Sequence, residues 1–368
     1  MFAHLTHTIA EAGGWISFAD YMNVALYAPG LGYYAAGSHK LGAGGDFVTA
    51  PELTPLFGRT LAIQIEETLA QLEHAEVIEL GPGSGRLCAD VLTELRARDA
   101  LPDRYWLLEV SPDLRERQRA HLNAAVPECL SRVGWIDVLP DRWSGVVLAN
   151  EVLDAVPVHL VARTNGEWLE RGVSLDGRGR LAFVDRPIAS ALLRERASAR
   201  FPADGDYRSE LNPAAEALVS SLARRCDRGL MLLIDYGFPG PEYYHPQRDQ
   251  GTLMAHHRHR SLADPFVRPG LTDLTAHVDF SAMAQAGAAA GMTLAGFTSQ
   301  AQFLINCGLT DRLGTQGDPQ SSAYLRAANA VQKLTSPAEM GELVKVLALT
   351  RGIELSVGFR EGDRTHRL

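Results

Sequence analysis

The sequence has few cysteines and no long apolar run, and each absence excludes a class of protein. Its 368 residues include four cysteines without a C-x-x-C pair, so we expect no dense disulfide framework. No apolar stretch approaches the roughly 20 residues that cross a bilayer, and residues 1–12 lack the basic start and apolar block of a signal peptide. These absences predict no membrane insertion and a reducing, cytoplasmic location.

An excess of basic residues is also missing. The formal net charge is −9, which argues against a protein that coats nucleic acid. Apolar residues make up 46% of the chain and charged residues 21%, a composition that excludes a disordered chain, a collagen-like rod and a coiled coil. The length predicts two domains, or one large domain with insertions.

Short apolar runs alternate with helical stretches from residue 75 onward. Helical patterns at 87–98 and 112–125 separate the apolar runs, which we interpret as buried strands at 77–80, 105–110, 145–149 and 229–235. Strands that alternate with helices form a parallel sheet covered on both faces. The sequence therefore predicts an α/β, doubly wound, Rossmann-like domain, with 292–297 and 343–350 as further strands that close the sheet.

Four segments organise the chain around this domain. Residues 1–74 form a helical N-terminal region with a long Gly/Pro-rich loop, 75–155 the first half of the domain, and 229–368 the second half. Residues 156–228 read as an insertion, in which turns at 164–166 and 176–179 separate three antiparallel strands at 159–163, 168–173 and 181–184 from one another, and a helical stretch follows at 192–225. A second insertion at 238–275 reads as irregular and returns to a helix at 281–290.

A glycine-rich turn lies where the first strand ends and a helix begins. Glu79-Leu80-Gly81-Pro82-Gly83-Ser84-Gly85 lets the backbone turn sharply and approach a ligand, which the free N–H groups of the helix start would face. The third glycine falls one residue too early for the G-x-G-x-x-G dinucleotide fingerprint, and the chain has no P-loop pattern. The turn resembles motif I of class I S-adenosylmethionine-dependent methyltransferases.

A second carboxylate strengthens this interpretation. Glu109 ends the next strand and is followed by Ser111, a position where an acid can accept hydrogen bonds from both ribose hydroxyls. The alternative is a helix-entry charge near Ser111. Asn150-Glu151 and Asp235-Tyr236-Gly237 also end strands, so we expect one crevice to contain these groups together with the glycine turn.

Five segments together resemble one narrow family, the MidA-type proteins, which are related to the mitochondrial complex I assembly methyltransferase. These segments are Ala25–Tyr34, Gly45–Glu52, Glu79–Gly85, Ala149–Ala155 and Asp273–Phe280. The chain departs from the family pattern at Thr54, which is usually Ser, and has Asn150 where the mitochondrial relatives have His.

The resemblance implies a class I methyltransferase fold with large insertions in a bacterial protein. It implies S-adenosylmethionine as methyl donor, S-adenosylhomocysteine as product, and a mitochondrial relative that symmetrically dimethylates an arginine in a complex I subunit. A protein substrate, such as a respiratory complex I subunit, is the expected partner. The resemblance leaves open whether bacterial members have an equivalent target, and the sequence leaves open whether the protein is a homodimer.

Carboxylates are the candidate catalytic groups, because they bind the planar guanidinium of arginine bidentately and can orient it as it loses a proton. The candidates are Glu151, which is the first choice, and Asp154, with Asp46 and Glu52 on a loop that would cover the cofactor. Structural roles compete: Asp154 could cap a helix, Glu52 could form a capping box with Thr49, and Asp46 could be a turn residue.

Three further assignments concern polar and aromatic side chains. Asn150 could accept a hydrogen bond from the amino group of the cofactor, and Trp135 could flank its adenine or be a core residue. His277 and Asp279 would point the same way on an extended segment and could contact substrate. Arginines interrupt the histidines of segment 256–260 and would repel a cation, so we expect no metal site there and a solvated loop that could meet an acidic partner.

Three other functions remain open at this point. A nicotinamide-dependent oxidoreductase would share the sheet and the turn, but the glycine spacing disfavours it. A methyltransferase that acts on a small molecule and a cofactor-binding assembly factor with little activity both fit the motifs.

Overall fold

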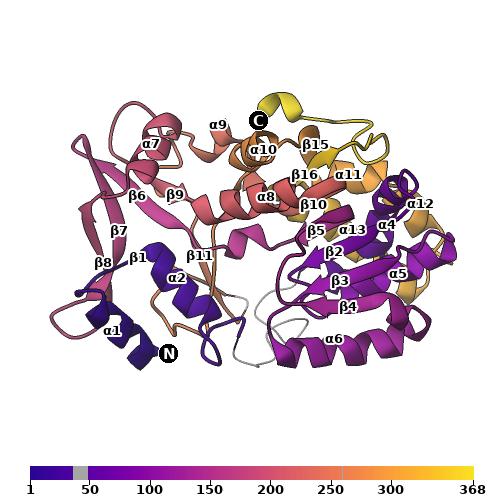
Figure 1. Cartoon of the computed structure of the whole chain (residues 1–368), viewed down its shortest axis with the longest axis horizontal. Helices are drawn as coiled ribbons and strands as arrows, with labels where there is room; N and C mark the ends of the chain where they lie inside the picture. The colour runs from indigo at the N-terminus through magenta and orange to yellow at the C-terminus, as the bar shows by residue number, and fades with distance from the viewer. Residues whose placement is uncertain (36–48, 259) are drawn as a thin grey trace.

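The structure is a computed structural model, and it describes residues 1–35, 49–258 and 260–368. Asp46 and most of the predicted covering loop therefore lie outside the described residues. Figure 1 shows two halves: a strand-and-helix half that contains the glycine turn, and a second half that the N-terminal helices and an antiparallel sheet form.

The larger sheet has the order β15-β16-β10-β5-β2-β3-β4, with β14 paired to β10. Neighbouring strands from β4 to β10 run parallel, whereas β16 is antiparallel to β10 and to β15. The predicted parallel sheet and its two closing strands are thus confirmed. Its strands are β2 (Glu76–Leu80), β3 (Arg104–Leu108), β4 (Val133–Ile136), β5 (Trp143–Asn150), β10 (Cys226–Phe238), β14 (Val278–Asp279), β15 (Thr293–Ser299) and β16 (Val344–Arg351).

Strand order reverses beside β2, because β3 and β4 lie on one side of it and β5 and β10 on the other. Such a reversal opens a crevice beyond the carboxyl ends of the strands, where ligands of open α/β sheets bind. The glycine turn follows β2 directly and therefore lies at this crevice.

Helices cover both faces of this sheet, as a doubly wound fold requires. Val77 and Val146 pack into one core cluster together with α4 and α5, whereas Ile78 and Val147 point to the other face and pack with α8 and α10. The covering helices are α4 (Pro55–Leu69), α5 (Arg86–Ala97), α6 (Pro112–Ala125), α8 (Pro213–Arg225), α10 (Phe280–Ala289) and α11 (Gln300–Asn306).

The second half contains an antiparallel sheet of order β1-β7-β6-β9, with β8 paired to β7. Leu160 and Val173 of this sheet share a core cluster with Phe18 and Leu26 of α2. The strands are β1 (Ile16–Ser17), β6 (His159–Thr164), β7 (Glu167–Leu175), β8 (Leu181–Pro187) and β9 (Tyr207–Leu211), and the helices are α1 (Phe2–Glu11), α2 (Phe18–Tyr27) and α7 (Ala191–Arg200).

The predicted hairpin strands at 159–184 are confirmed, but the continuous helix predicted over 192–225 is wrong. Strand β9 separates α7 from α8 and pairs with β6. Pro202 and the Asn212-Pro213 pair disfavour an unbroken helix. The alternation of β9 is hidden because one of its buried residues is Glu210.

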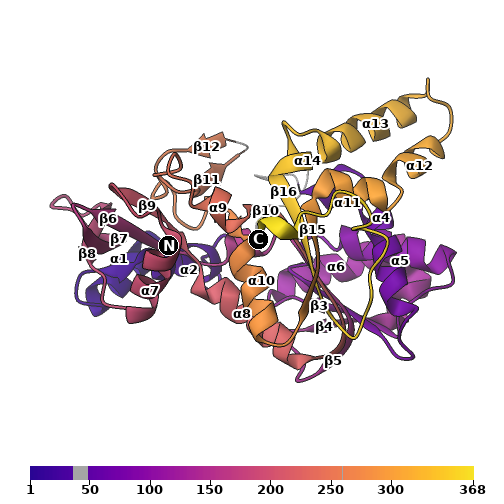
Figure 2. The same ribbon diagram turned by 90° about the horizontal axis from the view of Figure 1, so that it is seen from above.

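The segment 238–275, predicted as irregular, contains a third, small sheet of order β12-β11-β13. Figure 2 shows this sheet beside β9, in the half of the molecule that lacks the parallel strands. The segment contains helix α9 (Gly240–Tyr243) and the strands β11 (Met254–His257), β12 (Arg260–Leu262) and β13 (Asp273–Thr275).

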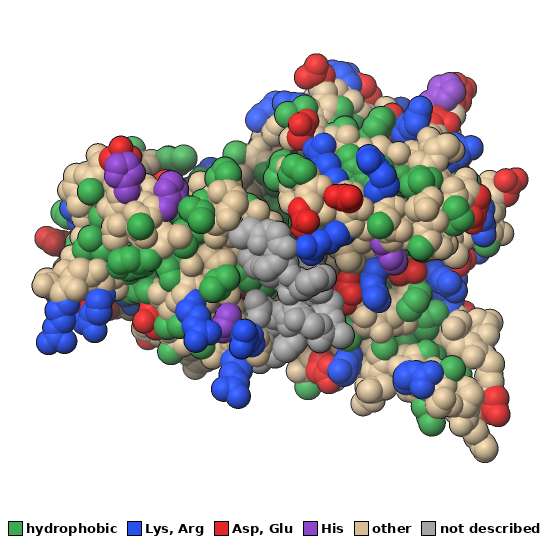
Figure 3. Space-filling model, turned by 90° about the horizontal axis from the view of Figure 1, so that it is seen from below, with side chains coloured by type: hydrophobic (Ala, Val, Ile, Leu, Met, Phe, Trp, Pro, Cys, Tyr) green, Lys and Arg blue, Asp and Glu red, His purple; other side chains and the backbone are tan. Residues whose placement is uncertain are grey.

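The remaining elements are short or peripheral. Figure 2 shows α12 and α13 extending beyond the large sheet, and no helix in the described ranges is long and apolar enough to span a membrane. On the face in Figure 3, acidic and basic side chains intersperse over the half that contains α5 and α6, while hydrophobic ones gather over the other half. The short or peripheral elements are α3 (Ala50–Leu53), α12 (Leu309–Gly314), α13 (Ser322–Thr335), α14 (Met340–Leu343) and 3₁₀ turns at Pro127–Arg132, Leu153–Ala155 and Thr365–Arg367.

Candidate active site

A cavity of about 820 Å³ lies at the crevice and takes its wall from both halves of the molecule. The four strand-end groups that the sequence placed in one crevice all contribute to this wall. Among its lining residues are Tyr27, Tyr34, Glu52, Glu79, Gly81, Pro82, Gly83, Ser84, Arg86, Glu109, Val110, Ser111, Asn150, Glu151, Asp154, Tyr236, His256, Asp273 and His277.

The glycine turn has the backbone that its residue types predict. Gly81, Gly83 and Gly85 have φ values of +57°, +53° and +82°, in the left-handed region that favours glycine. The N–H of Gly85 donates to the carbonyl of Pro82 at 2.8 Å and closes the turn, and α5 begins at the next residue. The turn therefore brings the start of α5, with its unpaired N–H groups, to the cavity.

Glu52 is joined to this turn. Its carboxylate accepts a hydrogen bond from the Ser84 hydroxyl and forms an ion pair with Arg86 Nε at 3.1 Å. The side chain of Thr49 makes no capping bond to α3, so the capping-box alternative for Glu52 is wrong. Glu52 instead lines the cavity and fixes the turn through these two contacts.

Glu109 lies at the end of β3 with its carboxylate held in place. Its Oε1 accepts from the Ser111 backbone N–H at 2.8 Å, and its Oε2 accepts from Gln118 Nε2 at 3.2 Å. Burial raises the pKa of Glu109. Ser111 caps α6 by accepting from Leu114 N–H at 3.4 Å. Glu109 therefore lies beside the start of this helix, as the alternative predicted, and it also lines the cavity.

Gln118, which the sequence analysis missed, connects the parts of this region. Its Nε2 also donates to the Gly83 carbonyl at 2.9 Å, and its Oε1 accepts from Trp135 Nε1 at 2.8 Å. Gln118 is buried beside Leu122 on the inner side of α6, a consequence of helix packing that no local pattern in the sequence marks.

Trp135 lies within β4. Gln118 lies between its indole N–H and Glu109, and Arg119 stacks on its ring at 4.7 Å from the ring centroid. Among the described lining residues Trp135 does not appear, so the structure places it behind the cavity wall.

Glu79 lines the cavity, but its carboxylate points into the protein. It is 2% exposed and accepts from the Tyr105 hydroxyl at 2.7 Å. Burial raises its pKa to about 8, although the bond from Tyr105 opposes this shift.

Glu151 has a strained backbone and an incompletely paired side chain. Its φ is +52°, which costs free energy for a residue other than glycine. Its Oε1 accepts from Ala50 N–H at 3.0 Å and from Asn150 Nδ2 at 3.2 Å. Its Oε2 and the Oδ1 of Asn150 are buried and have no hydrogen-bond partner in the described structure. Burial, with a contribution from the nearby Asp154, raises the pKa of Glu151 to about 8.

Asp154 lies in the 3₁₀ turn at Leu153–Ala155 and caps no helix that follows it. Buried Asp235 holds this turn, because its Oδ2 accepts from the N–H groups of Val152, Leu153 and Asp154 at 3.1, 2.8 and 3.3 Å. Burial and the nearby Asp235 and Asp273 raise the pKa of Asp154 well above its usual value. Burial and the charge of Glu151 raise the pKa of Asp235 to about 7.

The wall opposite the sheet is aromatic and acidic. Tyr34 donates its hydroxyl to Asp273 at 3.0 Å, and its ring stacks on Tyr27 with centroids 5.6 Å apart. The hydroxyl of Tyr27 donates to the carbonyl of Ala155 at 2.9 Å. The N-terminal tyrosines therefore lie beside the carboxylates that follow β5.

His277 lines the cavity, but Asp279 does not join it there. Asp279 caps α10 by accepting from Ala282 N–H at 3.1 Å. Burial, with Arg248 and Lys345 nearby, lowers the pKa of His277 to about 4, so its imidazole is neutral. The proposed pair of substrate contacts is therefore reduced to His277.

No group of three or more His, Cys, Asp and Glu residues in the described ranges has an arrangement that could hold a metal ion. His256 and His257 lie on β11, and His259 lies outside the described residues.

Several curated proteins are similar to this chain over most of its length. The mitochondrial protein arginine methyltransferase NDUFAF7 of Danio rerio is 32% identical, with 92% of this chain and 84% of that protein covered. The proteins of the same name from Rattus norvegicus and Homo sapiens are 31% and 30% identical, with 98% and 95% of this chain and 87% and 83% of those proteins covered.

Solved structures and a family model agree with these relatives. A Burkholderia thailandensis protein, crystallised with S-adenosyl-homocysteine, is 51% identical over all of this chain and 96% of that one, with a TM-score of 0.96. A native crystal structure from the same species has the same identity and coverage and a TM-score of 0.93. Residues 60–298 match the family model described as "Putative S-adenosyl-L-methionine-dependent methyltransferase". The chain belongs to this family of S-adenosyl-L-methionine-dependent methyltransferases.

Proposed function

We propose that this protein transfers a methyl group from S-adenosylmethionine to an arginine of a protein substrate. The observation that carries the proposal is a single cavity that joins the glycine turn to a wall of carboxylates and tyrosines. Among the described residues that line it, Arg86 is the one Lys or Arg side chain, and Glu52 pairs with it. The cavity therefore suits a cationic acceptor.

The residues present fit the cofactor. The left-handed glycines leave room at the turn, Glu109 offers carboxylate oxygens for ribose hydroxyls, and the buried, unpaired Oδ1 of Asn150 can accept from an ammonium group. When bound, the cofactor supplies an electrophilic methyl group. The protein has only to bind and orient the cofactor and the acceptor and to exclude water, which agrees with a cavity wall built from both halves.

Glu151 is the residue we propose to orient the acceptor. Its unpaired Oε2 can accept an N–H of a guanidinium group, whose planar fork suits carboxylates. A guanidinium must lose a proton as the new bond forms, and the raised pKa of Glu151 makes the ionised form of this side chain a stronger base for that proton. Asp154 and Asp273 contribute further carboxyl groups to the same wall.

The acceptor that we propose to test first is a respiratory complex I subunit in the cytoplasm of the source organism. The family resemblance and the mitochondrial arginine methyltransferases that match this chain support this choice.

The test incubates the protein with a lysate of the source organism and with S-adenosylmethionine that carries a labelled methyl group, and it measures the transfer of that label. Mass spectrometry of the labelled protein should place the methyl group on arginine, and Glu151→Gln should abolish the labelling. Label in a small molecule would favour the small-molecule alternative. Absence of transfer together with binding of S-adenosylhomocysteine would favour an assembly factor.

A further inference from the structure

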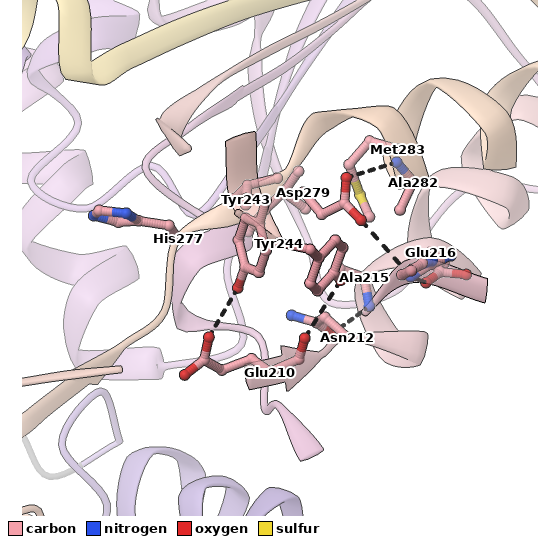
Figure 4. A pocket seen from close by; sticks show the side chains of 13 residues that line it. Glu210, Asn212, Ala215, Glu216, Tyr243, Tyr244, His277, Asp279, Ala282 and Met283 are labelled. Carbon is pink, nitrogen blue, oxygen red and sulfur yellow. Dashed lines mark hydrogen bonds and ion pairs between the residues drawn. The ribbon is translucent and has the colours of Figure 1, made fainter. Parts of the chain in front are cut away.

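Glu210 is a buried carboxylate outside the cavity wall, on β9 of the second half. It is 2% exposed, and in the described structure no Lys or Arg forms an ion pair with it. Its oxygens accept from Thr252 N–H at 3.0 Å, Leu253 N–H at 3.1 Å and the Tyr243 hydroxyl at 3.1 Å. Figure 4 shows the carboxylate facing Tyr243, with the ring of His277 directed away from this group. Burying a charge is costly unless such bonds compensate it.

The chain at residues 251–253 is fitted closely to this carboxylate. Gly251 has a φ of +76°, and a Cβ there would lie 2.2 Å from Glu210 Oε1. A glycine is needed for both reasons. The backbone N–H of Thr252 lies 3.0 Å from both carboxylate oxygens, so an amide nitrogen in place of either oxygen would face this donor.

Thr252 connects Glu210 to the cavity. Its hydroxyl donates to Glu210 Oε2 at 3.1 Å and accepts from the backbone N–H of His277 at 3.0 Å. His277 lines the cavity and belongs to the link between β13 and β14. Two side-chain bonds thus run from Glu210 to the backbone of a residue in the cavity wall.

The same contacts fix the strand that begins at Met254. β11 pairs with β13, where His256 lies opposite Asp273 and Met254 opposite Thr275. All four of these residues line the cavity, and β11 belongs to the half of the molecule that lacks the parallel strands and the glycine turn. Between the described residues, no hydrogen bond links Glu210 to the glycine turn or to Glu109.

We infer that Glu210 is a positioning residue for the methyl acceptor: it fixes β11, β13 and His277 as the acceptor wall without influencing the cofactor end of the cavity. The inference rests on the proposed function, in which this wall receives the acceptor. It assigns to the insertion at 156–228, through β9, a role in shaping the acceptor side of a cavity whose other end the large sheet forms.

The experiment compares Glu210→Gln with Thr252→Val, a milder variant of similar shape that removes only the hydroxyl. Hydrogen exchange of the protein saturated with S-adenosylhomocysteine should show faster exchange at 254–257 and 273–277 in both variants, with residues 76–80 unchanged. Calorimetry should give a Kd for S-adenosylhomocysteine within about 2-fold of wild type. Thr298→Val is the matched control, because Thr298 is a buried threonine on β15 whose hydroxyl donates to Gly362 at 2.7 Å.

Label transfer into lysate protein provides the kinetic readout. We expect the lysate concentration for half-maximal rate to rise about 10-fold or more in Glu210→Gln, with the saturating rate reduced less. Wild-type exchange and half-saturation in both variants, or a parallel loss of S-adenosylhomocysteine affinity, would overturn the inference. If wild-type protein transfers no label, the proposed function fails, whereas the exchange experiment still tests the positioning role.

Discussion

Replacing Glu151 by Gln should abolish methyl transfer while leaving the folded protein and its cofactor binding intact. Gln keeps an oxygen that can accept from Ala50 N–H and Asn150 Nδ2, as Oε1 of Glu151 does at 3.0 and 3.2 Å. The variant replaces Oε2, which has no partner in the described structure, by an amide nitrogen that cannot accept a proton. The change therefore acts on the acceptor, while the local contacts are kept.

The expected loss of activity follows from the role of this carboxylate. A positioned proton acceptor contributes about 10²- to 10⁴-fold to the rate, which corresponds to roughly 3 to 5.5 kcal/mol of activation free energy. We expect kcat/KM for the acceptor protein that the labelling identifies to fall by this factor, with the Kd for S-adenosylhomocysteine unchanged in calorimetry.

The pH dependence of stability provides a second, independent readout. Folding raises the pKa of Glu151 from 4.5 to about 8, so between these values the folded state binds a proton that the unfolded state has lost. This contribution to the free energy of unfolding falls as pH rises, by about 1.4 kcal/mol per pH unit at most. Gln does not titrate, so its stability relative to wild type should improve between pH 5 and 8 in denaturant titrations.

Two results would refute this reasoning. Turnover near the wild-type rate would show that another group orients the acceptor. A variant that loses stability relative to wild type as pH rises would show that Glu151 is ionised and stabilised in the folded protein, contrary to its burial.

Three other substitutions test the cofactor end and the turn after β5. Gly83→Val should abolish binding of S-adenosylhomocysteine in calorimetry, since a β-branched residue at a φ of +53° is strained and would fill the turn; retained affinity would contradict this. Gln118→Leu should weaken that binding by about 10-fold, because the Gly83 carbonyl and Glu109 lose a shared donor worth about 1 to 2 kcal/mol, and unchanged affinity would remove Gln118 from the site. Asp235→Asn should lower the free energy of unfolding by about 1 to 3 kcal/mol, since one carbonyl must replace a carboxylate that accepts four N–H groups; wild-type stability in urea would contradict it.

The sequence predicted the large sheet because its strands are apolar on both faces and its helices are amphipathic. The run around Val77 and Ile78 supplies both core clusters, a pattern typical of a buried parallel strand. The glycine turn was predictable because its local chemistry requires glycine. Strand β9 was not, because the contacts that stabilise buried Glu210 come from residues 33 and 42 positions away.

The sequence predicted the parts of the site where a motif marks a strand end, and it missed the parts where long-range contacts determine which side chains meet. Glu109 and Glu151 follow strands, so topology alone brings them to one cavity. The pairing of Tyr34 with Asp273 joins positions 239 residues apart, and the bridge made by Gln118 depends on how α6 packs. Neither has a local signature in the sequence.

The most direct test of the account is a crystal structure of this protein with S-adenosylhomocysteine. We predict that the ligand lies against Gly81–Gly85, with its ribose hydroxyls on Glu109 and its sulfur directed toward the part of the cavity that contains Glu151 and Asp273. A ligand bound elsewhere, or one whose sulfur faces away from these carboxylates, would contradict the assignment of one cavity to both donor and acceptor.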